Sequence, residues 1–186
     1  MSSVETARGG ESVSVHAEKA GKYLTFQLGN EEYGLSLLRV REIIALMDFT
    51  AVPLAPDYVR GVMNLRGKVI PVVDLRRKLD MPPTEDHERK CIIVVDVQHD
   101  DDIAQMGVLV DSVSEVLYIG ADEIEGPPNL SHSSGNNYVS GMAKTKDSIK
   151  ILLEVDHVLA RAVAETGQLA GRGAADSGSD QVQIQH

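Results

Sequence analysis

The chain has 186 residues, enough for one compact domain or two small lobes and too few for most multidomain enzymes. It carries 18 Lys and Arg against 28 Asp and Glu, a formal net charge of −10, which argues against nucleic acid and anionic membranes as partners because these bind clustered cations. No apolar run approaches the roughly 20 residues of a bilayer span, no secretion signal opens the chain, and the single cysteine cannot form an internal disulfide, so we expect a soluble cytoplasmic protein.

The two ends differ in composition from the middle. Residues 1–21 are polar and show little periodicity, which predicts a flexible N-terminal arm. Residues 166–186 are mostly small or polar, and such a composition cannot offset the entropy lost on ordering, which predicts a disordered tail. The folded domain is therefore expected over residues 22–165.

Short β-segments separated by turn residues dominate this domain. The turns are Gly29-Asn30, Arg66-Gly67-Lys68, Gln98–Asp102 and Asp147-Ser148. Pro71 lies inside one apolar segment and cannot donate to a sheet, so we expect it at an edge or a bulge. The predicted strands are Tyr23–Leu28, Glu32–Leu37, Gly61–Leu65, Val69–Leu75, Cys91–Val97, Ile103–Val110, Val113–Ile119, Tyr138–Lys144 and Ile149–Val155.

Helices are few. Asp74 can accept hydrogen bonds from the free N–H groups of a short helix over 75–79. Asp156 can open a C-terminal helix over about 157–165 in the same way, and Gly167 can end it. The sequence therefore predicts a mainly β fold with short helices, one of them C-terminal.

Several blocks of sequence recur in the same order, which indicates two copies of one unit, over about 23–79 and 91–159. The alternative is that unrelated strands resemble each other, since they share alternation and turn residues. The matched blocks are 58–62 with 138–142 and 69–75 with 149–155, both 80 positions apart, and 34–44 with 107–117, 73 positions apart.

Each unit has about five short strands, which is what a small closed barrel needs to eliminate exposed edges. Units of this size bury little surface alone, so the two should share an interface. We therefore expect a first lobe over 23–79, a second lobe over 91–159, a shared core and a groove between them.

The sequence contains no motif for nucleotide binding or nucleophilic catalysis. Its six histidines are scattered without metal-ligand spacing, and Cys91 opens an apolar strand, where an inert thiol is typical. We therefore predict no catalytic residue, no cofactor and no metal. An enzyme with its active site in the inter-lobe groove stays open as an alternative, and a deep polar pocket with perturbed carboxylates would favour it.

Some residues look unusual for a purely structural role. Arg66 follows Asn64-Leu65 between two apolar strands, where it is either a solvated turn cation or a partner contact. The segment Leu37–Ile44 fits a strand or a helix and has more apolar positions than one face can bury, so it is either core or a docking patch. Val113 and Val116, its counterparts in the second unit, carry the same ambiguity.

The stretches EEYGLSLLRVREII, APDYVRGVMNLRGKVIPVVDLRRKL and MGVLVDSVSEVL resemble the CheW family of bacterial chemotaxis adaptors, over about residues 22–160. The resemblance implies two five-stranded SH3-like barrels around a shared hydrophobic core. It also implies a non-enzymatic role in signal transduction, in which the protein couples the cytoplasmic tip of chemoreceptors to the regulatory domain of the histidine kinase CheA. That domain has the same fold, which implies pairing of lobe with lobe.

The resemblance further implies a cytoplasmic protein that is recruited to receptor arrays at the inner membrane. A coupling protein of a parallel pathway, in pili motility or gene regulation, fits the same residues. The N-terminal arm and the tail match nothing in the family pattern. The partner-binding residues carried over onto this sequence are Val40, Glu42, Asn64, Arg66, Val113 and Val116.

Overall fold

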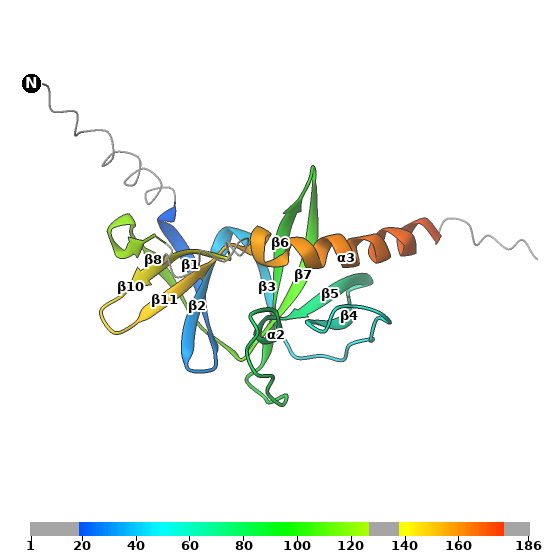
Figure 1. Cartoon of the computed structure of the whole chain (residues 1–186), viewed down its shortest axis with the longest axis horizontal. Helices are drawn as coiled ribbons and strands as arrows, with labels where there is room; N and C mark the ends of the chain where they lie inside the picture. The colour runs from blue at the N-terminus through cyan, green and yellow to red at the C-terminus, as the bar shows by residue number, and fades with distance from the viewer. Residues whose placement is uncertain (1–18, 127–137, 177–186) are drawn as a thin grey trace, which may run out of the picture.

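This computed structural model describes residues 19–126 and 138–176, and its strands form two sheets, one in each of two lobes (Figure 1). Lobe A has the strand order β8-β1-β2-β11-β10-β9, and lobe B has the order β3-β6-β7-β5-β4. The strands of lobe A are β1 (Gly21–Leu28), β2 (Glu31–Ser36), β8 (Ser112–Ile119), β9 (Ile124–Glu125), β10 (Val139–Lys144) and β11 (Ile149–Leu153). The strands of lobe B are β3 (Val40–Ala45), β4 (Val59–Leu65), β5 (Lys68–Asp74), β6 (Cys91–His99) and β7 (Asp102–Val110).

The two lobes share one pairing scheme. In lobe B the β6–β7 hairpin pairs with β3 on one side and runs parallel to β5 on the other, and β5 pairs with β4. In lobe A the β1–β2 hairpin, β8, β11 and β10 occupy the corresponding places, again with one parallel pair. The register shifts before Gly61 in β4 and before Gly141 in β10, which are repeat equivalents. The internal repeat is therefore a repeat of topology.

The predicted lobe boundaries, 23–79 and 91–159, are wrong. The first unit gives β1 and β2 to lobe A and β3, β4 and β5 to lobe B, whereas the second gives β6 and β7 to lobe B and the rest to lobe A. The chain crosses to lobe B through the 3₁₀ helix η1 (Leu37–Arg39) and returns between β7 and β8. Offsets in sequence identify equivalent strands, but they cannot tell which copy of a strand pairs with which, because pairing is long-range.

Lobe B closes on itself after β3. Thr50 exchanges two backbone hydrogen bonds with Val62 of β4, of 2.8 and 2.9 Å, so the segment that leaves one edge strand pairs with the other edge strand. The approach requires glycine at position 61, where φ is 141° and a Cβ would lie 2.3 Å from the Thr50 carbonyl oxygen. The mainly β, two-lobe fold predicted from the sequence is confirmed.

Three apolar clusters account for this arrangement. One cluster fills each lobe, and a larger cluster between them takes residues from β1 and β2 of lobe A, from β5, β6 and β7 of lobe B, and from the C-terminal helix. Strand β6 shows why: Ile92 and Val94 face the interior of lobe B, whereas Ile93 and Val95 face the shared cluster. Because successive side chains point to opposite faces, a continuous apolar run marks a strand buried on both sides.

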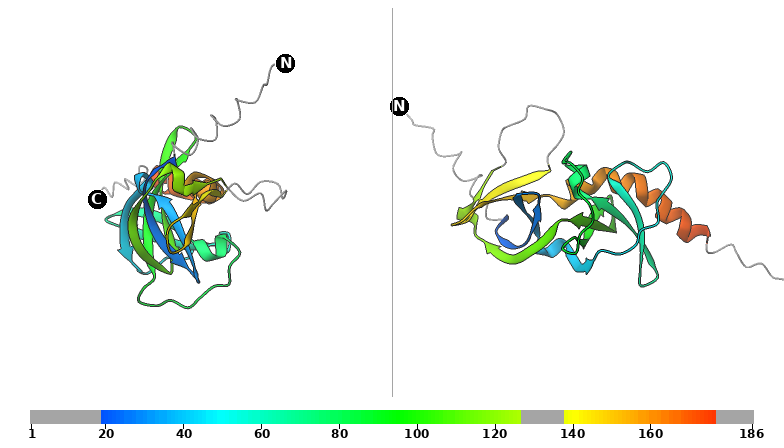
Figure 2. Two further views of the ribbon diagram at one scale, coloured as in Figure 1. Left: turned by 90° about the vertical axis from the view of Figure 1, so that its left-hand side faces the viewer. Right: turned by 90° about the horizontal axis from the view of Figure 1, so that it is seen from below.

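The C-terminal helix is longer than predicted. Helix α3 (Val155–Asp176) begins two residues before the expected start at 157 and continues through Gly167 to Asp176, rather than ending near 165. One glycine costs a helix only about 1 kcal/mol relative to alanine, so it need not end one. Helix α3 packs mainly against β6 of lobe B and runs along that lobe (Figure 2). Residues 177–186 of the predicted tail, like residues 1–18 of the predicted arm, lie outside the described residues.

Other local predictions gave mixed results. Asp74 accepts hydrogen bonds from the Arg76 and Arg77 amides and caps α2 (Leu75–Lys78), as predicted. The ambiguous segment Leu37–Ile44 divides into η1 and β3. Pro71 lies in the interior strand β5 instead of at an edge. The pairing of β5 with β7 begins at Val72, so the missing N–H of Pro71 leaves no gap in that ladder.

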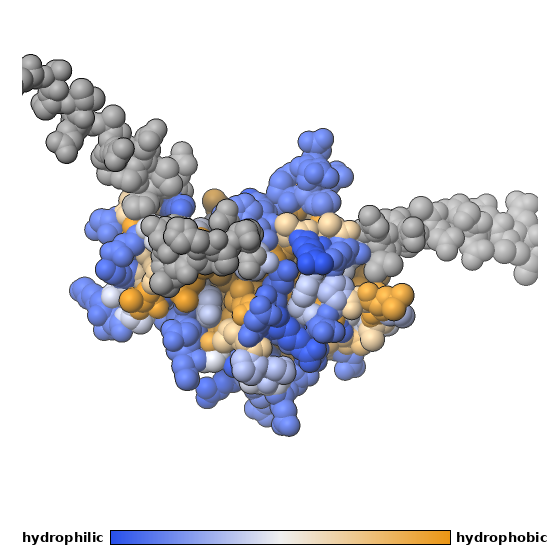
Figure 3. Space-filling view, in the orientation of Figure 1, coloured by the Kyte–Doolittle hydropathy of each residue, from blue (hydrophilic) through white to orange (hydrophobic). Residues whose placement is uncertain are grey.

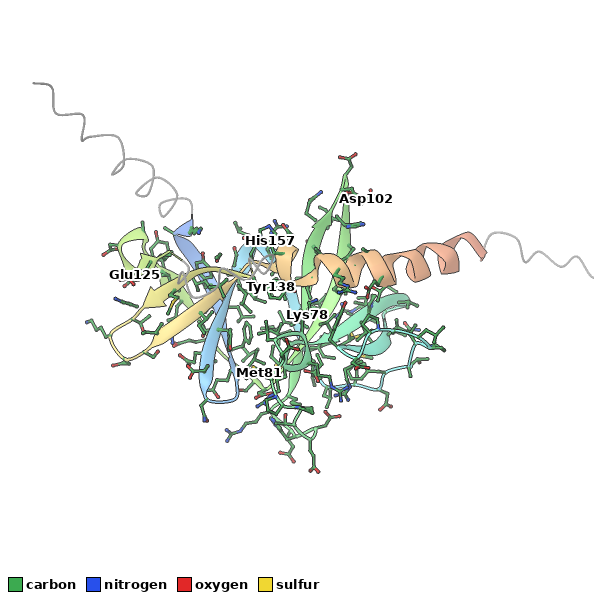
Figure 4. The ribbon with its side chains drawn as sticks, in the orientation of Figure 1. Lys78, Met81, Asp102, Glu125, Tyr138 and His157 are labelled. Carbon is green, nitrogen blue, oxygen red and sulfur yellow. The ribbon has the colours of Figure 1, made fainter. Side chains whose placement is uncertain are left out.

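Two repeat-equivalent tyrosines meet where the lobes join. The Lys78 ammonium lies 4.2 Å from the centre of the Tyr58 ring and 5.6 Å from that of Tyr138 (Figure 4). The Tyr58 hydroxyl donates to Glu165 of α3, and burial together with this carboxylate raises the pKa of Tyr58 to about 12. The junction is thus held by polar contacts at its rim as well as by apolar packing. No helix in the described part of the chain has the length and apolar character needed to cross a bilayer.

Candidate partner-binding surface

Arg66 projects from the tight turn between β4 and β5. Arg66 and Gly67 both have positive φ, 53° and 83°, as a two-residue hairpin turn that matches the strand twist requires. The Asn64 side-chain oxygen accepts the Gly67 amide at 2.9 Å and so fixes the turn. Asn64, predicted as a partner contact, therefore has a structural role that positions its neighbour.

The Arg66 side chain reaches across to Glu42 of β3. Its Nη1 and Nη2 atoms donate to the two carboxylate oxygens at 2.7 and 2.9 Å. These bonds lower the pKa of Glu42 below its ordinary value, and Glu42 in turn raises the pKa of Arg66. The Arg66 side chain is still 72% exposed, so the pair contributes little to stability and leaves the other N–H donors of the fork available.

The apolar residues predicted around this pair divide by exposure. Val40 is half-buried against the shared core, whereas Ile43 on the same strand is 45% exposed. Leu38 of η1 is 93% exposed. The segment that the sequence left open between core and docking patch therefore provides both, and its exposed members are Leu38 and Ile43 rather than the predicted Val40.

Val113 and Val116 lie elsewhere. Both are on β8, the edge strand of lobe A that corresponds to β3 of lobe B. Val113 is half-buried against the shared core, and Val116 is 50% exposed. The structure therefore brings Glu42, Asn64 and Arg66 together on lobe B and places the two valines on the other lobe.

The exposure of large apolar side chains is itself duplicated. Ile43 and Val116 are repeat equivalents and are 45% and 50% exposed, and Val69 and Ile149 are repeat equivalents and are 54% and 49% exposed. Val69 and Ile149 are the first residues of the matched blocks 69–75 and 149–155, but their exposure was not predicted from the sequence. Figure 3 shows apolar surface on both lobes with polar surface between. Each lobe thus offers the same kind of face.

The polar pair is not duplicated. The counterparts of Glu42 and Arg66 are Glu115 and Lys146, both exposed, and no ion pair joins them in the part of the chain that the structure describes. The two faces therefore have exposed apolar residues at equivalent positions, but they differ in their charged residues: Glu42 and Arg66 form an ion pair on lobe B, whereas Glu115 and Lys146 on lobe A, both among the described residues, do not pair with each other. A partner can distinguish them through the fixed guanidinium on lobe B.

A cavity of about 610 Å³ lies beside η1 and the first residues of α3. Its walls are mixed, with apolar, aromatic and cationic side chains from Lys19–Tyr23, η1, Tyr118, Ser140 and Leu153–Val155. None of the six predicted partner-binding residues lines it. The cavity is thus a second candidate surface.

Several carboxyl groups in the described residues form ion pairs that shift their pKa values. The carboxyls of Glu32, Asp86 and Glu165 have lowered pKa values, in each case mainly through a hydrogen bond from a Lys or Arg. Burial raises the pKa of the Cys91 thiol. Within the described ranges no three His, Cys, Asp or Glu side chains lie close enough to hold a metal ion.

Comparison with known proteins gives a consistent result. The family model described as the CheW-like domain matches residues 22–163. The chemotaxis protein CheW of Klebsiella aerogenes is 33% identical over 138 residues, which cover 74% of this chain and 81% of that protein. The chemotaxis protein CheW of Helicobacter pylori is 33% identical over 142 residues, covering 76% and 83%.

A solved structure is similar as well. The crystal structure of the scaffolding protein CheW from Thermoanaerobacter tengcongensis superposes with a TM-score of 0.66 at 32% sequence identity. The match covers 75% of this chain and 92% of the other. Both lobes and the start of α3 fall within the residues that the family model matches.

Proposed function

Because the chain belongs to the CheW-like domain family, we propose that it is a non-enzymatic adaptor that couples chemoreceptors to the histidine kinase CheA in chemotaxis signalling. The curated relatives are named chemotaxis proteins, and the similar solved structure is named a scaffolding protein. A scaffold must hold two partners at once, so it needs separate surfaces. Two lobes that each expose an apolar face meet that requirement.

The observation that carries the proposal is the exposed Arg66–Glu42 pair. Arg66 lies in the NLRG segment that carries the family resemblance. Hydrogen bonds to Glu42 orient its guanidinium group, while 72% of the side chain stays exposed. A planar set of N–H donors binds carboxylates and carbonyl oxygens of a partner in a defined direction. Glu42 and Arg66 are assigned to a contact with the receptor.

The apolar faces are assigned to the same task. Ile43 and Val116 lie on edge strands, and each points to the opposite face of its strand from the preceding residue, Glu42 or Glu115. Half-exposed aliphatic side chains are suited to the apolar centre of an interface. An interface of standard size buries about 800 Å² on each partner, and two of them fit on a chain whose surface is 12444 Å².

The kinase partner is assigned to a lobe face because its regulatory domain has the same fold in the family pattern. Pairing of one lobe with a lobe of the partner then extends an arrangement already present within the chain, where lobes A and B pack through a shared core. By this function the protein works at receptor arrays at the inner membrane, held there through its partners.

Two binding experiments test the function. We expect the purified chain to co-elute with the CheA regulatory domain in size-exclusion chromatography at micromolar concentrations, and to be retained by an immobilised receptor tip. Arg66→Glu should reduce retention by the receptor and leave elution of the free chain unchanged. Separate elution of adaptor and kinase domain well above micromolar concentrations would argue against the proposed role.

A further inference from the structure

Two ion pairs lie at the two places where the chain crosses between the lobes. At the return crossing after β7, the Asp111 carboxylate accepts hydrogen bonds from Arg76 of α2, at 2.6 to 3.0 Å, and from the backbone N–H of Gly29 in the β1–β2 hairpin, at 2.7 Å. The Arg76 and Asp111 side chains are 11% and 15% exposed. We call this group the buried latch.

The other crossing, at η1, is held in the same way with the charges exchanged. The Asp156 carboxylate at the start of α3 accepts from Arg39 of η1 at 2.6 Å and from the backbone N–H of Gln98 in the β6–β7 hairpin at 2.8 Å. Asp156 is the repeat equivalent of Arg76, 80 positions along the chain. We call this group the open latch, because its Arg39 and Asp156 side chains are 34% and 23% exposed.

The two latches have one plan. In each, a residue from the helix that follows β5 or its repeat equivalent β11 pairs with a residue at a crossing. The carboxylate of the pair also accepts a backbone N–H of the hairpin that belongs to the opposite lobe. They differ in access to solvent. Water screens an exposed pair and competes for its hydrogen bonds, so the open latch is the weaker of the two.

The open latch forms part of the wall of the 610 Å³ cavity. Arg39 lines this cavity together with Lys19 and Lys22, against the single carboxylate of Glu154. The cavity is therefore cationic in a chain whose net charge is −10. Among its lining residues, Leu38 and Tyr118 are 93% and 69% exposed, which adds a large apolar and an aromatic surface.

This combination defines the chemistry of an occupant. Cations attract carboxylates, and exposed Leu and Tyr side chains gain from covering by an apolar residue. A helix that carries acidic residues beside an apolar stripe satisfies both requirements, and a concave cavity suits a helix better than the convex face of another lobe.

We propose that the open latch is released by a partner: an acidic helical segment of the receptor tip docks in this cavity, takes Arg39 from Asp156, and thereby loosens the hold of α3 on the β6–β7 hairpin. The inference rests on the proposed function for the identity of the partner. The hairpin can transmit this change to another protein, because its tip at Asp102 stands away from the body of the protein (Figure 4).

The Gln98 amide reports the state of the open latch, and the Gly29 amide reports the buried latch. We expect a saturating receptor-tip fragment to accelerate hydrogen exchange at the Gln98 amide of the full chain by about tenfold or more, since a hydrogen bond to a charged group is weakened. Exchange at the Gly29 amide should stay unchanged. Both amides can be followed in one NMR experiment, so the second is an internal control.

Two pairs of variants sharpen the test. Arg39→Met should give fast exchange at Gln98 without the fragment and no further acceleration with it, whereas the matched Arg76→Met should affect Gly29 and spare Gln98. Lys22→Glu should weaken binding of the fragment about tenfold, and Arg89→Glu, a charge reversal of the same size outside the cavity, should leave it unchanged.

The possible results separate the two proposals. Binding of the fragment to the wild-type chain with unchanged exchange at Gln98, or with equal acceleration at Gly29, would overturn the latch and leave the adaptor role standing. Acceleration by the kinase regulatory domain instead of the receptor fragment would overturn the choice of partner. Absence of receptor binding by the wild-type chain would overturn both.

Discussion

Arg66 and Glu42 join the two ends of one sheet. In lobe B, β3 is one edge strand and β4 is the other, yet the guanidinium in the β4–β5 turn meets the carboxylate of β3 through bonds of 2.7 and 2.9 Å. The sheet is therefore curled until its edges meet at this pair. The curvature that closes the lobe also fixes the direction in which Arg66 faces solvent.

Exchanging the two charged residues distinguishes the two possible roles of this pair, which are to close lobe B and to contact the receptor. Arg66→Glu should abolish the ion pair and weaken receptor binding, with the melting temperature nearly unchanged because the pair is exposed. The double variant Glu42→Arg, Arg66→Glu should restore the ion pair but not the binding, which calorimetry with a receptor-tip fragment can measure. Recovery of full affinity in the double variant would mean that closure of the lobe, rather than the exposed fork, matters to the partner.

Gly61 should tolerate no side chain. A Cβ at this position would lie 2.3 Å from the Thr50 carbonyl oxygen, so Gly61→Ala must separate β4 from the segment that closes lobe B. We expect a loss of at least about 3 kcal/mol in the free energy of unfolding, measured by urea denaturation. Gly67→Ala is the matched control, since its φ is also positive but no atom lies within 4 Å, and it should cost about 1 kcal/mol.

The shared cluster should make the lobes unfold together. Phe26 is fully buried in this cluster, and Phe26→Ala should cost about 3–5 kcal/mol through lost burial and a cavity. We expect one cooperative urea transition for both the wild-type chain and the variant, followed by circular dichroism and by NMR signals from each lobe. Two separated transitions, one for each lobe, would contradict a single core.

Acid should weaken the buried latch. Burial alone would raise the pKa of Asp111, but the hydrogen bonds from Arg76 and Gly29 outweigh it and hold the pKa below the ordinary value of 3.8. The unfolded state then takes up a proton more readily, so this stabilisation is complete above about pH 5 and is lost as the pH falls through the folded-state pKa.

Asp111→Asn provides the measurement. We expect the variant to be less stable at pH 7 by about 2 kcal/mol, because a charge-assisted bond is replaced by a neutral one. Its further loss between pH 5 and pH 3 in urea titrations should be smaller than that of the wild-type chain. An equal loss in both proteins would show that other carboxyls, such as Glu32 or Asp86, account for the acid sensitivity.

Local signals predicted the hairpins well. The turns at Gly29-Asn30 and Arg66-Gly67 and the cap at Asp74 depend on a few adjacent residues, and the structure has them where the sequence places them. The division into lobes was predicted wrongly because it depends on which copy of each strand pairs with which. That choice depends on total burial in the shared cluster, and no short stretch of sequence encodes it.

The candidate site shows the same limit. Arg66 was identified from its unusual place in a turn and from the family pattern, but its pairing with Glu42 depends on how far the sheet curls. The latches were missed because Arg39 and Asp156 are 117 residues apart. Charged residues at such separations give no periodic signal. Asp156 was predicted to cap the helix, but it is the second residue of α3, and its carboxylate binds the β6–β7 hairpin instead.

The exchange of strands between the repeats also sets an order for biosynthesis. Lobe B is one continuous stretch from Val40 to Val110, whereas lobe A needs β1 and β2 from before that stretch and β8 to β11 from after it. All strands of lobe B are therefore synthesised before β8 and β11, the strands that pair with the β1–β2 hairpin in lobe A. Until Ile149–Leu153 emerges, the β2 edge of that hairpin has no pairing partner, and an unpaired edge favours aggregation of the nascent chain.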